Sequence, residues 1–128
     1  MNSDTLLHRQ VHPDFVQQSD VSSQVFEASS AAFKPTPKDA NKLSVYNGEK
    51  FTAKAAFDHF TTQYASRGVL SVTVNECTTI GLNAVEDNNP FDGHAYIDFS
   101  SCTSENQKKV KAKLLKNSAL KRGWSYFQ

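Results

Sequence analysis

Short runs of alternating apolar and polar residues constrain this chain most, because a period of two is typical of strands with one buried face. In the run 94–99, Ala95, Ile97 and Phe99 share one face. The other face of that run carries His94, Tyr96 and Asp98, which either line a pocket or face water. Runs 5–11, 42–46 and 69–74 alternate in the same way, and 83–86 fits a further short strand.

Two stretches carry helix signals. Thr52 is a suitable cap for a helix that reaches about Ser66, before Gly68. Ser104, with Gln107 three positions later, begins the best-marked helix, which ends before Gly123. With 38% apolar residues and nine Phe, the chain can form a core. The sequence predicts one α+β domain over 1–128, with a mixed or mainly antiparallel sheet of about four or five strands and two principal helices.

Between these elements, residues 17–42 form a long stretch rich in Ser and Pro. It holds two Ser-Ser-x-x-Phe units, at 22–26 and 29–33, which fit one structural copy and one inserted copy. Either unit fits the insertion. A structureless connection is rarely this long, so we expect part of it to add an edge strand or border a binding cleft. The stretch is the preferred functional surface.

Charge is unevenly distributed along the chain. Seven of the fourteen Lys and Arg residues lie between Lys108 and Arg122, whereas residues 1–101 carry seven basic and twelve acidic side chains. Lysines on one helix followed by an aromatic residue can contact phosphates and stack on a base. The alternative is a solvated helix that pairs with the acidic body. The candidate binding residues of this basic helix, 104–122, and its tail are Lys108, Lys109, Lys111, Lys113, Lys116, Arg122 and Trp124.

A second candidate site combines Arg9 and Ser44, on two predicted strands, with a later carboxylate, Glu76 or Glu86. In order and element type, this set resembles the Arg–Ser–Glu layout of ADP-ribosyltransferase-like enzymes. That resemblance implies that the arginine holds a phosphate, the serine orders the pocket and the glutamate aids transfer at the ribose. The sequence lacks the Glu-x-Glu pair and Ser-Thr-Ser run of those enzymes. The alternative is that Arg9 pairs with an acid of the body.

Metal and thiol chemistry have weaker support. His8, His12 and His94 lack the tight spacing of recognisable zinc ligands, so we predict no metal and no cofactor. Cys77 and Cys102 have neither a CxxC spacing nor the density of a disulfide scaffold, and we expect both to be reduced. The first residues are polar, and no stretch has the length of a membrane span, so we expect a cytoplasmic protein without a membrane partner.

Leu7-His8-Arg9, the Ser-Ser-x-x-Phe units, Leu43-Ser44-Val45 and His94-Ala95 together resemble small bacterial hypothetical proteins of the mobile gene-cassette type. The resemblance implies a bacterial cytoplasmic setting and no particular activity. The sequence therefore favours a non-catalytic binding or accessory protein that uses its long loop and basic helix. We expect a protein partner, and a homodimer only because dimers are common. The alternatives are a small nucleotide-handling enzyme built around Arg9 and Ser44, or a weak nucleic-acid binder.

Overall fold

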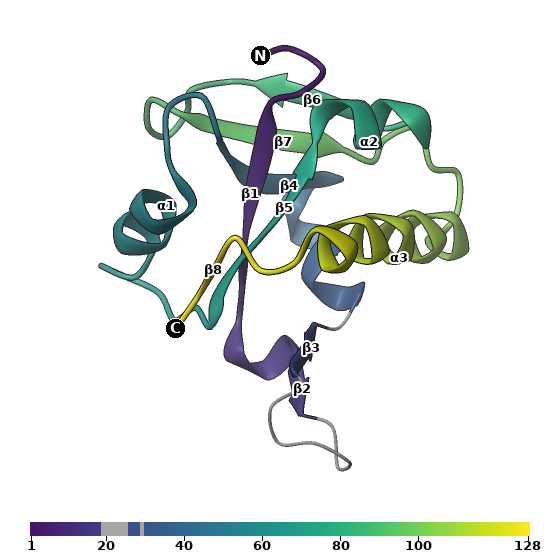
Figure 1. Cartoon of the computed structure of the whole chain (residues 1–128). Coiled ribbons are helices and arrows are strands. Elements are labelled where there is room, and N and C mark those ends of the chain that lie inside the picture. Colours follow the sequence, from purple (N-terminus) through teal and green to yellow (C-terminus); the bar gives the residue numbers. More distant parts are fainter. Residues whose placement is uncertain (19–25, 29) are drawn as a thin grey trace.

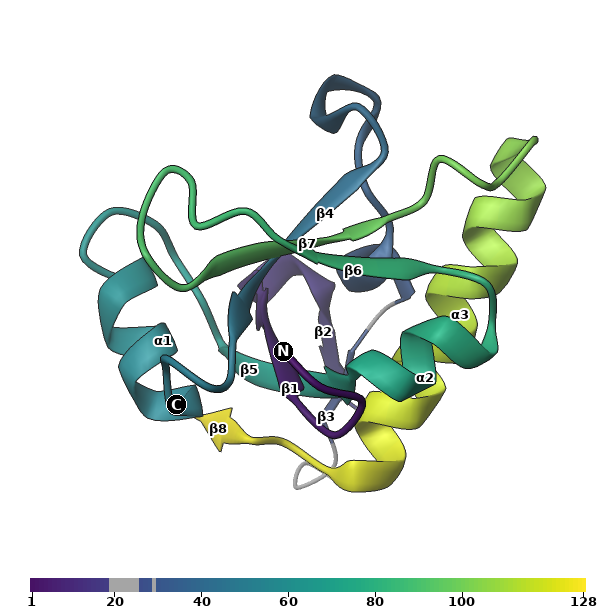
Figure 2. The ribbon, with the colours of Figure 1, turned by 90° about the horizontal axis from the view of Figure 1, so that it is seen from above.

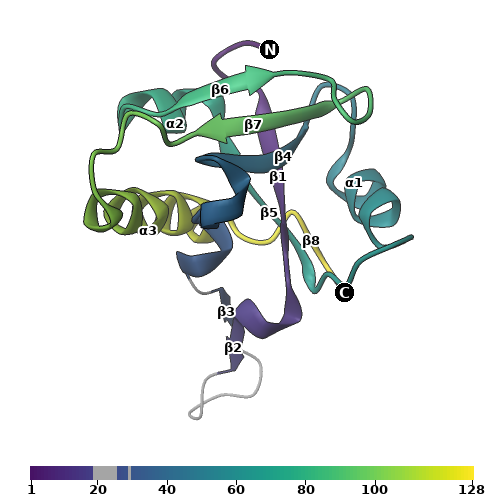
Figure 3. The same ribbon diagram turned by 180° about the vertical axis from the view of Figure 1, so that it is seen from behind.

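The main sheet of the protein is antiparallel throughout. The computed structural model describes residues 1–18, 26–28 and 30–128, and within this part the sheet has six strands in the order β6-β7-β4-β1-β5-β8 (Figure 1). The strands are β1 (Leu6–Val11), β4 (Lys42–Asn47), β5 (Gly68–Thr73), β6 (Asn83–Glu86), β7 (His94–Asp98) and β8 (Tyr126–Phe127). Figure 3 shows β6 and β7 side by side at one edge of this sheet.

Alternation in the sequence decides which face of the sheet is apolar. Leu43 and Val45 of β4 are buried opposite Ile97 and Ala95 of β7, as predicted. Leu7 of β1 pairs with Val72 of β5 on the same face. The opposite face carries more polar side chains, among them His8, Gln10, Ser44, Tyr46, Ser71, His94 and Tyr96. One face of the sheet therefore forms the core, and the other is available for a site.

Helices cover the two faces unequally. Helices α2 (Val74–Thr79) and α3 (Glu105–Arg122) lie on the apolar face, and α1 (Ala53–Phe60) lies on the polar face (Figures 1 and 2). Ala112, Leu115 and Ala119 of α3 are buried in the core, whereas Val110 and Leu114 are exposed. The buried positions follow the spacing i, i+3 and i+7, so one narrow face of α3 packs into the core.

The long connection before β4 is structured where it is described. Strands β2 (Val16–Gln18) and β3 (Phe26–Ala28) pair with each other and form a separate two-stranded sheet. The short 3-10 helices η1 (Pro13–Phe15), η2 (Ser30–Phe33) and η3 (Pro37–Asp39) flank it. Phe33 is fully buried beside α3 and β1, so the second Ser-Ser-x-x-Phe unit supplies a core residue. Most of the first unit lies outside the described residues.

The structure differs from the sequence prediction in three respects. The sheet has six strands, not four or five, because Tyr126 and Phe127 add β8 beside β5. The helix from Thr52 ends at Phe60, not near Ser66, because the hydroxyls of Thr61 and Thr62 bond to carbonyls of its last turn. Val74–Thr79, for which the sequence predicted no element beyond the end of a strand, forms α2, a third helix whose capping box joins Thr73 and Glu76.

Candidate functional site

A cavity of about 430 Å³ opens on the polar face of the sheet. Its floor comes from β1, β4 and the start of β7, one wall from the end of α1, and the other wall from the loop between β6 and β7. The residues around it are Arg9, Gln10, Ser44, Val45, Tyr46, His59, Phe60, Thr62, Gln63, Tyr64, Pro90, Phe91 and His94. Its volume is typical of sites for small molecules. We call it the Arg9 cavity.

Arg9 reaches this cavity because two strands diverge. The pairing of β1 with β4 covers two residue pairs, Leu7 with Asn47 and His8 with Tyr46. Beyond them, the Arg9 guanidinium donates through Nη1 to the Ser44 carbonyl at 2.8 Å and through Nε to the Ala32 carbonyl at 2.8 Å. Where the pairing of β1 with β4 has ended, the Arg9 side chain thus links β1 to β4 and to the segment that carries Ala32. The structure therefore places Arg9 against the main-chain carbonyl of Ser44, the residue with which it was grouped from the sequence.

Burial shapes the electrostatics of Arg9. Loss of hydration lowers the pKa of its guanidinium to about 10, although the negative charge of Asp39 acts in the opposite direction. Arg9 therefore stays charged at neutral pH. Among the described residues, no carboxylate forms an ion pair with it, and none lines the cavity. The expected pairing of Arg9 with an acid is replaced by bonds to two carbonyls.

An aromatic cluster of Tyr46, His59 and Phe91 forms part of the cavity lining. The Phe91 ring lies 4.5 Å from the His59 ring and 5.1 Å from the Tyr46 ring, between centroids. The Tyr46 hydroxyl is 2.8 Å from His59 Nδ1, and burial raises the pKa of Tyr46 to about 12, so this phenol stays neutral. Phe60 and Tyr64 stack on each other at 5.2 Å along the rim. The cavity thus combines one cation with flat apolar walls.

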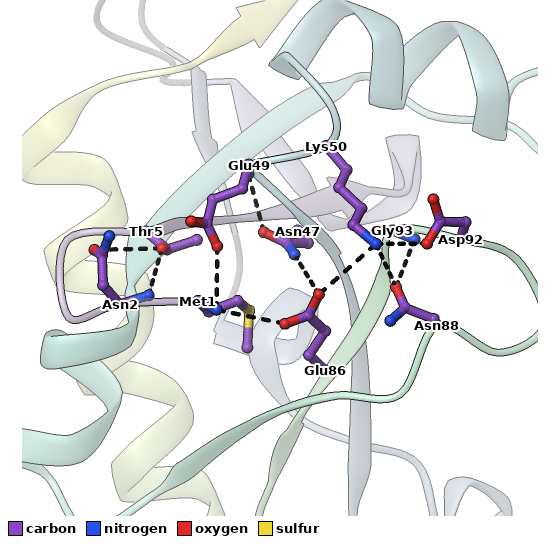
Figure 4. Close-up of polar contacts among 10 residues, drawn as sticks. All are labelled: Met1, Asn2, Thr5, Asn47, Glu49, Lys50, Glu86, Asn88, Asp92 and Gly93. Carbon is purple, nitrogen blue, oxygen red and sulfur yellow. Dashed lines mark hydrogen bonds and ion pairs between the residues drawn. The ribbon is translucent and has the colours of Figure 1, made fainter.

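Polar contacts hold the loop that carries Phe91. Lys50 Nζ bonds to Asp92 at 2.5 Å and to Asn88 at 3.3 Å, and Asn88 accepts the Gly93 amide at 2.9 Å (Figure 4). In the same view, Glu86 lies between the amino group of Met1, at 3.4 Å, and the side chains of Lys50 and Asn47. The β6–β7 loop is therefore tied to the turn after β4, which fixes one wall of the cavity.

A hydrogen-bond relay, buried at His8 and Ser71, joins β1 to the exposed Ser125 of the C-terminal tail. His8 Nε2 lies 3.1 Å from the Phe51 carbonyl, which only accepts, so Nε2 carries the proton. Burial lowers the pKa of His8, and the neutral ring accepts the Ser71 hydroxyl at Nδ1, at 2.7 Å. Ser71 in turn accepts from Ser125 at 2.7 Å. The relay connects β1, β5 and the tail.

This relay makes stability depend on pH. His8 has a lower pKa in the folded protein than its ordinary value of 6.5, so below pH 6.5 the unfolded chain binds a proton that the folded chain does not. The free energy of unfolding should therefore fall as pH decreases from 6.5 toward 5. Urea unfolding at several pH values measures the slope. It should flatten in His8→Gln and persist in His12→Gln, because the His12 side chain is 49% exposed. A slope that His8→Gln leaves intact would contradict this origin.

The structure separates the glutamates from Arg9 and Ser44. Glu76 belongs to the capping box of α2 and binds Arg122 at 2.8 Å. Burial acts to raise the pKa of Glu76, but the hydrogen bonds from Arg122 and Thr73 together lower it below its ordinary value. Glu86 lies among Met1, Asn47 and Lys50 in the loop-holding cluster. Neither glutamate lines the Arg9 cavity. The Arg–Ser–Glu grouping is therefore wrong as a geometric set, because its carboxylates belong to other contacts.

The basic helix is divided by its contacts. Lys109 and Lys113 border an open hollow with Lys34 and Val110, between η2 and α3. Lys108 pairs with Glu105 at 3.3 Å. At the other end of α3, Arg122 binds the Ser71 carbonyl and Glu76, and Trp124 packs against Phe127. Lys111 and Lys116 are half-buried. The lysines of the helix and its Arg122–Trp124 end thus lie in different places. The hypothesis that this helix binds a partner stays a prediction.

Other predicted chemistry finds less support. His94 is the first residue of β7 and Cys102 lies after the other end of that strand, and burial raises the pKa of the Cys77 thiol to about 12. In the described parts of the chain, no group of three or more His, Cys, Asp or Glu side chains is placed to hold a metal ion, and no disulfide links the cysteines. None of the described helices combines the length and hydropathy needed to cross a bilayer. No protein-family model, curated protein or solved structure matches the chain.

Proposed function

We propose that this protein binds a small organic anion with a flat apolar portion in the Arg9 cavity. The observation that carries the proposal is the charge of Arg9, which is half-buried at a cavity whose described lining has no carboxylate. Two of its five N–H groups bond to backbone carbonyls. A bound carboxylate or phosphate would accept from the others and replace the hydration that Arg9 has lost.

The rest of the cavity favours an aromatic or otherwise planar ligand. Phe91, Tyr46 and His59 present ring faces and edges on one side, and Phe60 with Tyr64 borders the opening. Stacking between flat groups adds to the burial of apolar area. A volume of about 430 Å³ suits one small molecule and not an extended polymer.

This proposal retains binding as the function but moves it from the long loop and basic helix to the polar face of the sheet. Arg9 still connects the two surfaces, because η2 supplies the Ala32 carbonyl that holds it. A cytoplasmic location is part of the proposal, supported by the two unlinked cysteines. A protein partner and a homodimer remain proposals that rest on the sequence.

Binding of simple aromatic anions tests the proposed function. Benzoate and phenyl phosphate should bind with a Kd of about 1 mM or lower, whereas neutral benzyl alcohol should bind at least about tenfold more weakly, which corresponds to about 1.4 kcal/mol. The difference arises because the alcohol lacks the charge that would pair with Arg9. Isothermal calorimetry, or chemical shifts followed during titration, measures both affinities.

Tyr64→Ala provides a test of the site with little risk to the fold, because Tyr64 is 63% exposed. The substitution removes one wall of the opening and should weaken benzoate binding several-fold. The matched control is Tyr96→Ala, which removes a tyrosine from outside the cavity lining. Equal affinities for benzoate and benzyl alcohol, or binding that Tyr96→Ala weakens as much as Tyr64→Ala does, would refute the proposed site.

A further inference from the structure

Asp87 and His94 form a carboxylate–imidazole pair at the edge of the Arg9 cavity. His94 Nδ1 lies 2.6 Å from Asp87 Oδ1, and the two side chains are 13% and 29% exposed. The ionised carboxylate only accepts, so Nδ1 carries a proton, and in the neutral ring Nε2 has the lone pair. Within the described structure, Nε2 has no hydrogen-bond partner and is not fully buried. His94 is also one of the residues that line the cavity.

The backbone holds this pair in place. Asp87 directly follows β6 and His94 begins β7, so the loop between them must return over a short distance. The Asn88 amide donates to the His94 carbonyl at 3.0 Å, and the His94 amide donates to the Phe91 carbonyl at 3.1 Å. The Phe91 ring meets the imidazole edge to face at 5.4 Å. The imidazole is thus oriented by a carboxylate on one side and an aromatic ring on another, as a positioned base requires.

Sheet register places Ser44 on the same face as His94, and Arg9, whose strand position lies on the core side, joins them in the lining of the cavity. Tyr46 pairs with His94 and Ser44 pairs with Tyr96, so Ser44 and His94 are diagonal neighbours on one face. Diagonal neighbours have Cα atoms roughly 7–8 Å apart, a separation that leaves room for a water molecule between their side chains. Arg9 is bonded to the Ser44 carbonyl. An anion on Arg9 would therefore bring the rest of the same molecule close to His94.

We infer that His94 is the general base of an esterase site. The substrates are planar hydroxy-aromatic acids whose phenolic hydroxyl is esterified by a carboxylic acid, so that the acid group of the ring stays free. This substrate class rests on the proposed function, because Arg9 would hold the acid group. A water molecule gives a proton to His94 Nε2 and its oxygen attacks the ester carbonyl carbon. The tetrahedral intermediate collapses, the bond between the acyl carbon and the aryl oxygen breaks, and the imidazolium returns the proton to the phenolate. Asp87 is the positioning residue that keeps the proton on Nδ1.

Hydrolysis of 4-acetoxybenzoate tests this step, since the compound carries both the anionic ring and the ester. The protein should release acetate and 4-hydroxybenzoate well above the buffer rate and should prefer this substrate to neutral phenyl acetate. His94→Ala should lower kcat by about 10²–10⁴-fold, and added imidazole should restore part of the loss. Asp87→Asn should lower kcat and leave KM nearly unchanged. A purely structural role of His94 would not give rescue by imidazole.

His12→Ala is the matched control, because His12 is an exposed histidine outside the cavity and should leave the rate unchanged. Benzoate affinity, measured on the same samples, separates the two proposals. Benzoate binding without ester hydrolysis above buffer would overturn the esterase inference alone. If the unaltered protein showed neither benzoate binding nor ester hydrolysis, the proposed function would be overturned as well. Hydrolysis that falls equally in His12→Ala would show surface histidine chemistry and would also overturn the inference.

Discussion

Phe33→Ala should lower the free energy of unfolding by about 3–5 kcal/mol, a large share of the roughly 5–15 kcal/mol that holds a domain of this kind together. The Phe33 side chain, at the end of η2, is fully buried in the main core cluster, and η2 packs against α3 and β1. The substitution loses the favourable free energy of transferring the ring out of water, and it leaves a cavity that destabilises the folded state further. Equilibrium unfolding in urea, followed by fluorescence and circular dichroism, measures the loss.

The control for Phe33→Ala is Tyr64→Ala, which removes a similar ring from a position that is 63% exposed and should change stability by no more than about 0.5 kcal/mol. The Phe33 result also bears on the duplicated Ser-Ser-x-x-Phe unit. A loss of less than about 1 kcal/mol would mean that Phe33 does not act as a core residue. A full loss would identify the second unit as the structural copy.

Local patterns predicted the elements that depend on local physics. Strands β4 and β7 alternate between apolar and polar residues, and their apolar positions are buried as expected. Helix α3 begins after Ser104, whose hydroxyl accepts the Gln107 amide, and it ends at Arg122 before Gly123. In each case, the signal and the contact lie within a few residues. These elements require no information from the rest of the chain.

Long-range pairing could not be predicted in the same way. Strand β8 has two residues and exists because the tail after Gly123 returns along β5, where Gly68 allows the close approach of the Tyr126 carbonyl. In the sequence, Gly68 indicated only the end of a helix. That helix ends eight residues earlier, at Phe60. The glycine is required by the neighbouring strand, so its role depends on a partner 58 residues away.

The candidate site was predicted in part. Arg9 and Ser44 were grouped by their positions on two predicted strands. The structure brings the Arg9 guanidinium to the main-chain carbonyl of Ser44, whereas the role of the Ser44 side chain stays a prediction. The polar face of β7 was expected either to line a pocket or to face water, and His94 on that face lines the cavity. Phe91 and His59 were missed, because one lies in a loop and the other follows no motif. A sequence signal for Phe91 exists only in the Asn-rich turn around it.

Arg9→Met should abolish measurable benzoate binding and also lower the free energy of unfolding by about 1–3 kcal/mol. Methionine can fill much of the space of the arginine stem, but the Ala32 and Ser44 carbonyls would lose their charged donors. Relief from burying a charge offsets part of that loss, so the change in stability should be smaller than for Phe33→Ala. Calorimetric titration with benzoate and urea unfolding measure the two effects on one sample.

Two further variants separate the roles of charge and geometry at this position. Arg9→Lys retains the charge but cannot bond to both carbonyls with a planar fork, so it should bind benzoate weakly and recover little stability. Lys113→Met removes the same charge from the exposed hollow beside α3, outside the cavity, and should change neither measurement by much. If Arg9→Met bound benzoate as tightly as the unaltered protein while unfolding more easily, Arg9 would serve only to join β1, β4 and η2. Loss of binding in Arg9→Met, with binding intact in Lys113→Met, would instead assign the anion to the Arg9 guanidinium and not to the net charge of the protein.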